Sequence, residues 1–324
     1  MGSPRKLTAP PRRLAILLAY GTVYICWGAT YTAMSIGVRL LPATVLAGTR
    51  MLIAGLIMLA FCGLRGKQLL YNRGTMWRLA ALGALMLFGG NVGLVWSEKY
   101  LASGLAALLV AVVPLYVAVI ESLSPRGERL RKQGVAGLGL GFLALIALLW
   151  PSFHQAVGAS SRPVQMVAAL VVLLGALSWA IGSVWFRRLR LDVDPLVAAG
   201  WEMITAAVCN IAFATAFWRW PQAQWNEKSE GAVGFLILFG SLMGFSCYIW
   251  LIRNVPVAKV ATYTYVNPVI AVILGGLVLG EHLPPTEYVG MIAVICSVVI
   301  VNTSRTNSGR SLAEVEVEPL EHEA

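Results

Sequence analysis

The chain has 324 residues and a net charge of +10 at pH 7, yet only 12% of its residues are charged and 58% are hydrophobic. Soluble proteins carry about 25% charged residues, so this composition excludes an ordinary soluble globular protein. The positive charges are scattered through short segments between apolar blocks, which argues against a nucleic-acid-binding surface.

Ten apolar blocks follow one another along the chain. Each is about 20 residues long, enough to cross the roughly 30 Å hydrocarbon core of a bilayer as a helix. The sequence therefore predicts an all-α polytopic membrane protein in the lipid bilayer of the plasma membrane, or of the inner membrane in a Gram-negative bacterium. The predicted spans are residues 14–38, 43–64, 77–98, 101–122, 133–150, 165–187, 196–217, 231–252, 256–280 and 287–303.

Polar segments flank and join these blocks. Residues 1–13 are basic, residues 151–164 form a linker, and residues 304–324 are acidic and too poor in apolar residues to fold. Nineteen Lys and Arg residues lie on the side of the N-terminus and five on the other side. Because cytoplasmic segments carry the excess of Lys and Arg, both termini are predicted to be cytoplasmic and the linker external.

The second half of the chain repeats the first. Ala47–Leu52 and Ala199–Ile204 are similar sequences 152 positions apart. Other matched positions are Trp27 with Trp179, Trp96 with Trp250, and Pro114 with Pro268. Five spans per copy is an odd number, so the second copy enters the membrane from the opposite side. Residues 14–150 and 165–303 are therefore predicted to be two inverted five-helix repeats, an architecture of secondary transporters whose site lies between the halves.

Each repeat carries one charge inside a span, Arg50 in the second span and Glu202 in the seventh. Such a charge costs roughly 3 kcal/mol or more, so it usually has a function or a partner. Depth in the spans places the two backbones roughly 12 Å apart along the membrane normal. Arg50 would hold a carboxylate in fork geometry, and Glu202 an amine or a proton, which suits a zwitterion such as an amino acid. A buried ion pair and a snorkelling Arg50 are the alternatives.

Aromatic side chains are further candidates for a solute site. Trp27 and Tyr31 share one face of the first span, and Trp179 is the symmetry mate of Trp27. Tyr263 lies four residues before Asn267 in the ninth span. These rings are predicted to line a cavity and pack against aromatic or apolar solutes. The alternative is the ordinary preference of Trp and Tyr for the membrane interface.

Amides and carboxylates complete the set of polar candidates. Asn91 follows Gly90, and Asn267 precedes Pro268, so both amides lie where the helix is loosened. Each is predicted either to contact solute or to make a helix–helix hydrogen bond. The carboxylates at span ends are predicted to be solvated; they are Glu98, Glu121 and Glu281.

Both halves of the chain contain short motifs that can be compared with those of known families: Gly90-Asn91, Trp96–Glu98, Ser103–Leu109, Val113–Leu115, Tyr265–Val272, Gly275 and Gly280-Glu281. Together these motifs resemble the EamA-type carriers of the drug/metabolite transporter superfamily. The charges of the second and seventh spans resemble YedA-like exporters within it. Ala102 departs from the Pro that the family often has there. The resemblance implies ten helices in two inverted halves around a central cavity, with the fifth and tenth helices at the periphery, and export of small organic solutes.

The sequence contains no phosphate-binding Gly-x4-Gly-Lys-Ser/Thr loop, no nucleophile elbow and no cysteine pattern for a metal. We therefore expect no cofactor, no metal and no enzymatic activity. The prediction is a secondary active exporter of small organic metabolites or drugs, amino acids among them, working by alternating access. Proton coupling and a monomeric or homodimeric state are left open. The alternatives are an exchanger of sugar phosphates or nucleotide sugars, a membrane-integral enzyme and a non-transporting sensor.

Overall fold

The computed structural model describes residues 13–123, 132–137, 139–141, 143–144, 162–281 and 285–303, and the regular elements within these residues are all helical. In the labels below, η1, η4 and η5 are π-helical turns and η3 is a 3₁₀ turn. The elements are α1 (Arg13–Val38), α2 (Ala43–Leu64), α3 (Arg73–Gly83), η1 (Ala84–Gly89), α4 (Val92–Ser97), α5 (Ser103–Val110), α6 (Val113–Leu123), α8 (Arg162–Leu189), α9 (Pro195–Ala216), η3 (Trp220–Gln222), α10 (Glu227–Phe235), η4 (Leu236–Phe245), α11 (Ser246–Asn254), α12 (Val257–Val260), α13 (Tyr263–Leu274), η5 (Gly275–Leu279) and α14 (Pro285–Thr303).

Seven helical stretches of the described residues are long and apolar enough to cross a bilayer, and they match predicted spans one to four and six to eight. Shorter apolar helices, Tyr263–Leu279 and Tyr288–Ser297, lie at the ninth and tenth. Ten spans remain a prediction, because much of the fifth lies outside the described residues. So do the basic residues 1–12, most of the linker and the acidic tail.

The two helices that carry the intramembrane charges, α2 and α9, pack against each other in antiparallel directions. Gly48 of α2 lies beside Ile211 of α9, and Gly55 lies beside Ile204. Gly200 of α9 lies beside Leu59 in turn. Glycine at these positions lets the two backbones approach closely. The antiparallel direction is the one that the inverted repeat predicts for this pair.

Helices in both halves are interrupted beside Gly and Pro. The predicted fourth span is broken at residues 111–112, directly before Pro114, which is the second residue of α6. Proline has no N–H to donate and disfavours the helical conformation in the residue before it. The third and eighth spans each contain a π-helical segment, η1 and η4. Such segments are rare in proteins, and those that occur are often found at functional sites.

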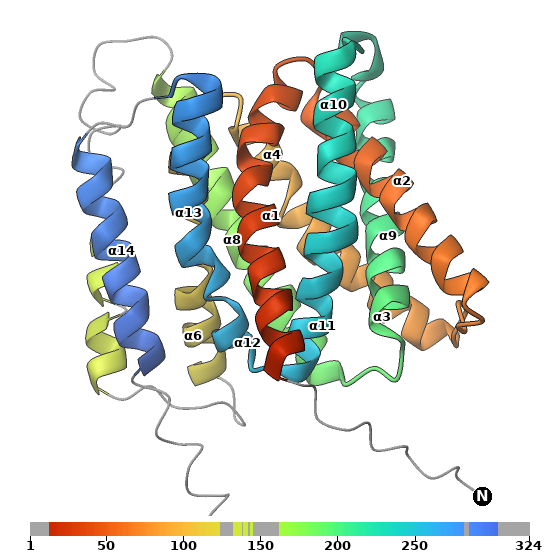
Figure 1. Ribbon diagram of the computed structural model, residues 1–324, viewed down its shortest axis with the longest axis horizontal. Coiled ribbons are helices and arrows are strands. Elements are labelled where there is room, and N and C mark those ends of the chain that lie inside the picture. The colour runs from red at the N-terminus through yellow and green to blue at the C-terminus, as the bar shows by residue number, and fades with distance from the viewer. Residues whose placement is uncertain are drawn as a thin grey trace, which may run out of the picture.

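The helices stand side by side in one bundle, with α1 in front at the centre and α14 at one edge (Figure 1). Ser297 of α14 donates a hydrogen bond of 2.6 Å to the carbonyl of Gly137, which ties α14 to the described part of the fifth predicted span. Both segments thus lie at the side of the bundle rather than at its centre, where α1, α2, α8, α9 and η4 converge.

Candidate solute site

A central cavity lies between the two halves of the chain. Seven of the eight residues that the sequence predicts for the site line it: Trp27, Tyr31, Arg50, Asn91, Trp179, Tyr263 and Asn267. The eighth, Glu202, does not line it, although its neighbour Met203 does. The cavity thus joins residues that are more than 200 positions apart in the sequence.

Arg50 supplies the positive charge of the cavity. One nitrogen of its guanidinium, Nη2, donates a hydrogen bond to the side-chain oxygen of Asn91. The Nε atom is buried and has no hydrogen-bond partner in the structure. Only 5% of the residue is exposed, so the Arg50 side chain does not snorkel to the surface in this structure. A buried guanidinium with a free donor can bind an anionic group that enters the cavity.

Aromatic rings form another part of the cavity wall. The Trp27 ring lies 5.5 Å from that of Trp179, edge to face, and 4.9 Å from that of Tyr263. These are the centroid separations and orientations that aromatic pairs prefer. The indole Nε1 of Trp27 donates to the carbonyl of Gly240 in η4 at 3.0 Å. Trp27 is therefore held in the cavity wall and is not at the membrane interface.

Tyr248 is a central part of this cluster that the sequence analysis does not identify. Its ring lies 5.0 Å from Trp27, and its hydroxyl accepts a hydrogen bond from Trp179 Nε1 at 3.0 Å. The same hydroxyl is 2.7 Å from the hydroxyl of Ser183. The available signal was a tyrosine deep in the eighth span, together with a Ser one helical turn after Trp179. The network fixes the orientation of Trp179.

The two amides have partners within the protein, which favours the helix–helix interpretation that was left open for them. Asn91 accepts from Arg50, and it lies where the helix is interrupted between η1 and α4. The amide nitrogen of Asn267, assigned from its surroundings, donates to the carbonyl of Tyr24 at 3.2 Å and to that of Tyr263 at 3.0 Å. Asn267 thereby connects α13 with α1, and both amides still line the cavity.

Glu202 is buried apart from the cavity. Its exposed fraction is 0%, and both carboxylate oxygens lack a hydrogen-bond partner in the structure. Its backbone packs directly on Gly83 of α3. The antiparallel contacts between α2 and α9 show which residue of α9 lies at the level of Arg50. Glu202 is about seven residues away from that position along α9, or roughly 10 Å. The ion pairs in the described residues are Lys67–Asp194 and Arg188–Glu121, so Arg50 and Glu202 do not pair.

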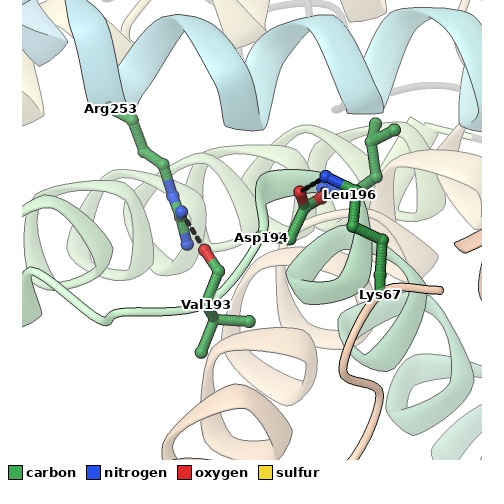
Figure 2. Close-up of polar contacts among 5 residues, drawn as sticks. All are labelled: Lys67, Val193, Asp194, Leu196 and Arg253. Carbon is green, nitrogen blue, oxygen red and sulfur yellow. Dashed lines mark hydrogen bonds and ion pairs between the residues drawn. The ribbon is translucent and has the colours of Figure 1, made fainter. Parts of the chain in front are cut away.

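A polar cluster joins the halves near Glu202, where α2 ends and α9 begins (Figure 2). Lys67 Nζ lies 2.7 Å from the carboxylate of Asp194, which also accepts from the N–H of Leu196 at 3.0 Å and so caps α9. Arg253 of α11 extends to the carbonyl of Val193 and donates a hydrogen bond to it. This end of the α2–α9 pair is therefore held by protein groups.

The pair of Lys67 and Asp194 makes stability depend on pH in a defined direction. Burial raises the pKa of Asp194, but the hydrogen bonds from Lys67 and Leu196 outweigh it, so the pKa lies below its ordinary value of 3.8. A lowered carboxyl pKa gives stability that is present above that value and is lost as pH falls through the folded pKa. The hydrogen bond with Asp194 raises the pKa of Lys67 above 10.5, so its contribution is lost only at higher pH.

Asp194→Asn keeps a side-chain oxygen for the helix cap and removes the ion pair. Because the Lys67 side chain is 49% exposed and exposed pairs contribute little, we expect a small decrease in melting temperature at neutral pH. Melting curves recorded from pH 7 to pH 3 should show an acid-dependent loss in the wild type that is weaker in the variant. Identical pH profiles would contradict the assignment.

One sequence prediction about the carboxylates is wrong for Glu98. It was expected to be solvated, but it is 1% exposed and neither oxygen has a partner in the structure. The cause is tertiary, since α4 ends inside the bundle against neighbouring helices. Glu281 is also engaged, because its carboxylate accepts from the N–H and the hydroxyl of Ser103 at 2.9 and 2.6 Å. Glu121 is partly exposed and lies 3.6 Å from Arg188.

Comparison with known proteins agrees with this architecture. The EamA-like transporter family matches residues 13–150 and again residues 166–303. The chain is 35% identical over 294 residues to the uncharacterized inner membrane transporter YedA of Escherichia coli K12, covering 90% of this chain and 92% of that protein. It is 26% identical to the uncharacterized transporter YvbV of Bacillus subtilis, covering 91% and 93%.

A solved crystal structure has the same fold, with a TM-score of 0.66 at 21% identity, covering 91% of this chain and all of that one. The two family matches correspond to the two copies of the repeat, and each copy contributes walls of the central cavity. The chain is thus a multi-pass membrane transporter that belongs to the EamA-like transporter family.

Proposed function

We propose that the protein is a secondary active exporter of small organic carboxylates that carry an aromatic or apolar body. It would work by alternating access, with two inverted five-helix halves moving around the central cavity. The main supporting observation is the buried guanidinium of Arg50, which has an unused donor and lines a cavity that is also lined by aromatic rings. The positive group would bind the carboxylate while the rings pack against the body of the solute.

Amino acids with aromatic side chains meet these requirements, and they remain within the proposed substrate class. The cavity wall offers no carboxylate among its described residues for the amine of such a zwitterion. Tyrosine hydroxyls and the carbonyls freed in the irregular helices would accept from the amine instead. Glu202, buried outside the cavity, is better suited to carrying a proton than to holding the amine.

The proposed orientation follows from the distribution of Lys and Arg. With nineteen of these residues on the side of the termini and five on the other side, both termini would lie in the cytoplasm. The plasma membrane, or the inner membrane of a Gram-negative cell, is the proposed location, and the inner-membrane assignment of the Escherichia coli relative supports it. Export over import follows from the family resemblance.

The rival functions receive less support from the cavity. A carrier of phosphorylated sugars would need several cationic groups, whereas Arg50 is the one charged residue among those that line the cavity in the described chain. A membrane-integral enzyme would need acid, base or nucleophile groups together. The described lining contains no Asp, Glu, His or Cys.

The test is transport in proteoliposomes that contain the purified protein. Phenylalanine and tryptophan are compared with their carboxamides, which keep the ring and lose the anionic group, with and without a proton gradient. We expect the acids to be transported and the amides to be transported far more slowly. Equal rates for acid and amide would remove the role of Arg50, and no transport of any of the four would overturn the proposed substrate class.

Glu202→Gln tests the proton role separately. Glutamine has nearly the same volume, and neither Glu202 oxygen has a partner to lose, so the variant should reach the membrane in wild-type amount. We expect transport driven by a proton gradient to be abolished while exchange of solute down its own gradient continues. If proton-driven transport is unchanged in this variant, Glu202 does not carry the coupled proton.

A further inference from the structure

A second pocket, separate from the central cavity, lies at the end of the bundle where α1 is followed by α2, the upper end in Figure 1. Three cationic side chains line it: Arg39 from the α1–α2 connection, Lys99 after α4, and Arg219 after α9. These are three of only five Lys and Arg residues on that side of the protein.

The position of the pocket shows that it is no extension of the solute cavity. Residues Asn91 and Leu94 face the cavity, whereas Val92 and Trp96 line the second pocket. The two spaces therefore lie on different faces of α4. The second pocket lies between the α2–α9 pair and the α4–α8 pair, with Phe213 of α9 in its wall.

The three cations lack acidic partners. Within the described residues, none of them forms an ion pair. Lys99 Nζ lies 6.0 Å from the ring centroid of Tyr100, which is also in the wall. Arg39 interacts electrostatically with the buried Glu98, but neither carboxylate oxygen of Glu98 has a hydrogen-bond partner in the structure.

At the opposite end of the molecule, the equivalent cations have acceptors that the second pocket lacks. The repeat makes Lys67 the equivalent of Arg219 and Arg253 the equivalent of Lys99. There, Lys67 pairs with Asp194, and Arg253 donates to the carbonyl of Val193 (Figure 2).

The residue equivalent to Asp194 is Pro42, which has no side-chain acceptor and itself lines the second pocket. The two sets of cations related by the repeat thus differ. Lys67 and Arg253 bind acceptors within the protein, whereas Arg219 and Lys99 lack the equivalent acceptors.

Exposed aromatic residues at this end place the pocket at the level of the lipid headgroups. Trp218 and Trp220 follow α9 and are 73% and 39% exposed, and Phe213 in the pocket wall is 40% exposed. Trp is enriched where membrane meets water. An anion that reaches this pocket therefore has both lipid and water beside it.

We propose that this pocket binds the phosphate group of an anionic phospholipid from the adjacent leaflet. Lys99 and Arg219 contact the phosphate, Arg39 contributes charge, and the acyl chains leave along Phe213 and the apolar surface of the bundle. Basic pockets between transmembrane helices suit such headgroups, and the guanidinium fork matches phosphate geometry. The proposal does not depend on the solute carried by the central cavity, nor on which leaflet lies at this end.

Native mass spectrometry of the protein released from nanodiscs of phosphatidylcholine with phosphatidylglycerol tests the proposal. The wild type should retain phosphatidylglycerol in preference to phosphatidylcholine. Lys99→Gln and Arg219→Gln should each weaken that retention about fivefold, and the double variant should weaken it further. Lys228→Gln is the matched control, because it removes a cation at the same end that does not line this pocket.

Each outcome decides for or against the lipid. Equal retention in the double variant and the wild type would overturn the proposal, as would equal loss in Lys228→Gln. Glycerol 3-phosphate, added at millimolar concentration, should not displace the lipid; displacement would identify a site for soluble anions instead. Thermal unfolding of each variant checks the fold, and the single variants report independently if the double variant is unstable.

Discussion

Arg50→Gln is expected to lower transport of carboxylate solutes by roughly 30-fold or more at subsaturating concentration. Removing one partner of a buried, hydrogen-bonded charge pair costs on the order of 2–5 kcal/mol, and each 1.4 kcal/mol is a factor of ten. The loss should be specific to the acids, because the carboxamides gain little from the guanidinium. Transport of phenylalanine and of its carboxamide by wild type and variant gives the two ratios to compare.

Two further variants separate a binding role of Arg50 from a structural one. Arg50→Lys keeps the positive charge and loses the fork, so transport of the acids should fall to an intermediate level. Asn91→Ala removes the hydrogen-bond partner of Arg50 and leaves the charge, so the acids should still be preferred over the amides. If Arg50→Gln fails to fold while Arg50→Lys folds and transports acid and amide equally, the charge serves the fold and not the solute.

Gly83→Ala is expected to have the largest effect on stability. A Cβ atom at position 83 would lie 2.8 Å from the Cα and 3.0 Å from the carbonyl carbon of Glu202. Both are backbone atoms of α9, which cannot turn away as a flexible side chain could. Overpacking of this kind costs roughly 1–3 kcal/mol and sometimes more. We expect a lower melting temperature and less monodisperse protein, measured by size-exclusion chromatography after heating.

The control for Gly83→Ala is Gly234→Ala in α10, where an added methyl group would meet no atom within 4 Å. Alanine favours helix over glycine by up to about 1 kcal/mol, so this variant should be as stable as the wild type or slightly more stable. Equal melting temperatures for Gly83→Ala and the wild type would show that α3 and α9 can separate without cost.

The contrast between Arg50 and Glu202 bears on how the protein would couple solute to protons. One charge lies in the cavity, where a solute can reach it, and the other is sealed beside α3 with no hydrogen-bond partner. The backbone of Glu202 rests on Gly83, and Met203 next to it lines the cavity. A shift of α9 on solute binding would therefore change the surroundings of Glu202, and in the proposed alternating access this would connect solute binding with protonation.

The sequence by itself was enough to predict the membrane class, the twofold repeat and seven of the residues that line the cavity. The length of an apolar block indicates a membrane span, because the thickness of the bilayer sets the length of a spanning helix. The repeat offset of 152 residues places Trp27 and Trp179 at equivalent positions. Charge within an apolar block identified Arg50, since such a charge is costly. None of these inferences requires knowledge of how one helix lies against another.

Only the tertiary structure decided which polar groups meet. Tyr248 enters the aromatic cluster because α11 brings it beside Trp27 and Trp179. Its place deep in the eighth span does not by itself show which rings it meets. Glu98 is at a span end and yet buried, since burial depends on neighbouring helices. Glu202 lies outside the cavity because its part of α9 packs on Gly83 of α3, while its neighbour Met203 lines the cavity. Periodicity places a residue on a helix, and packing of the helices decides what that residue contacts.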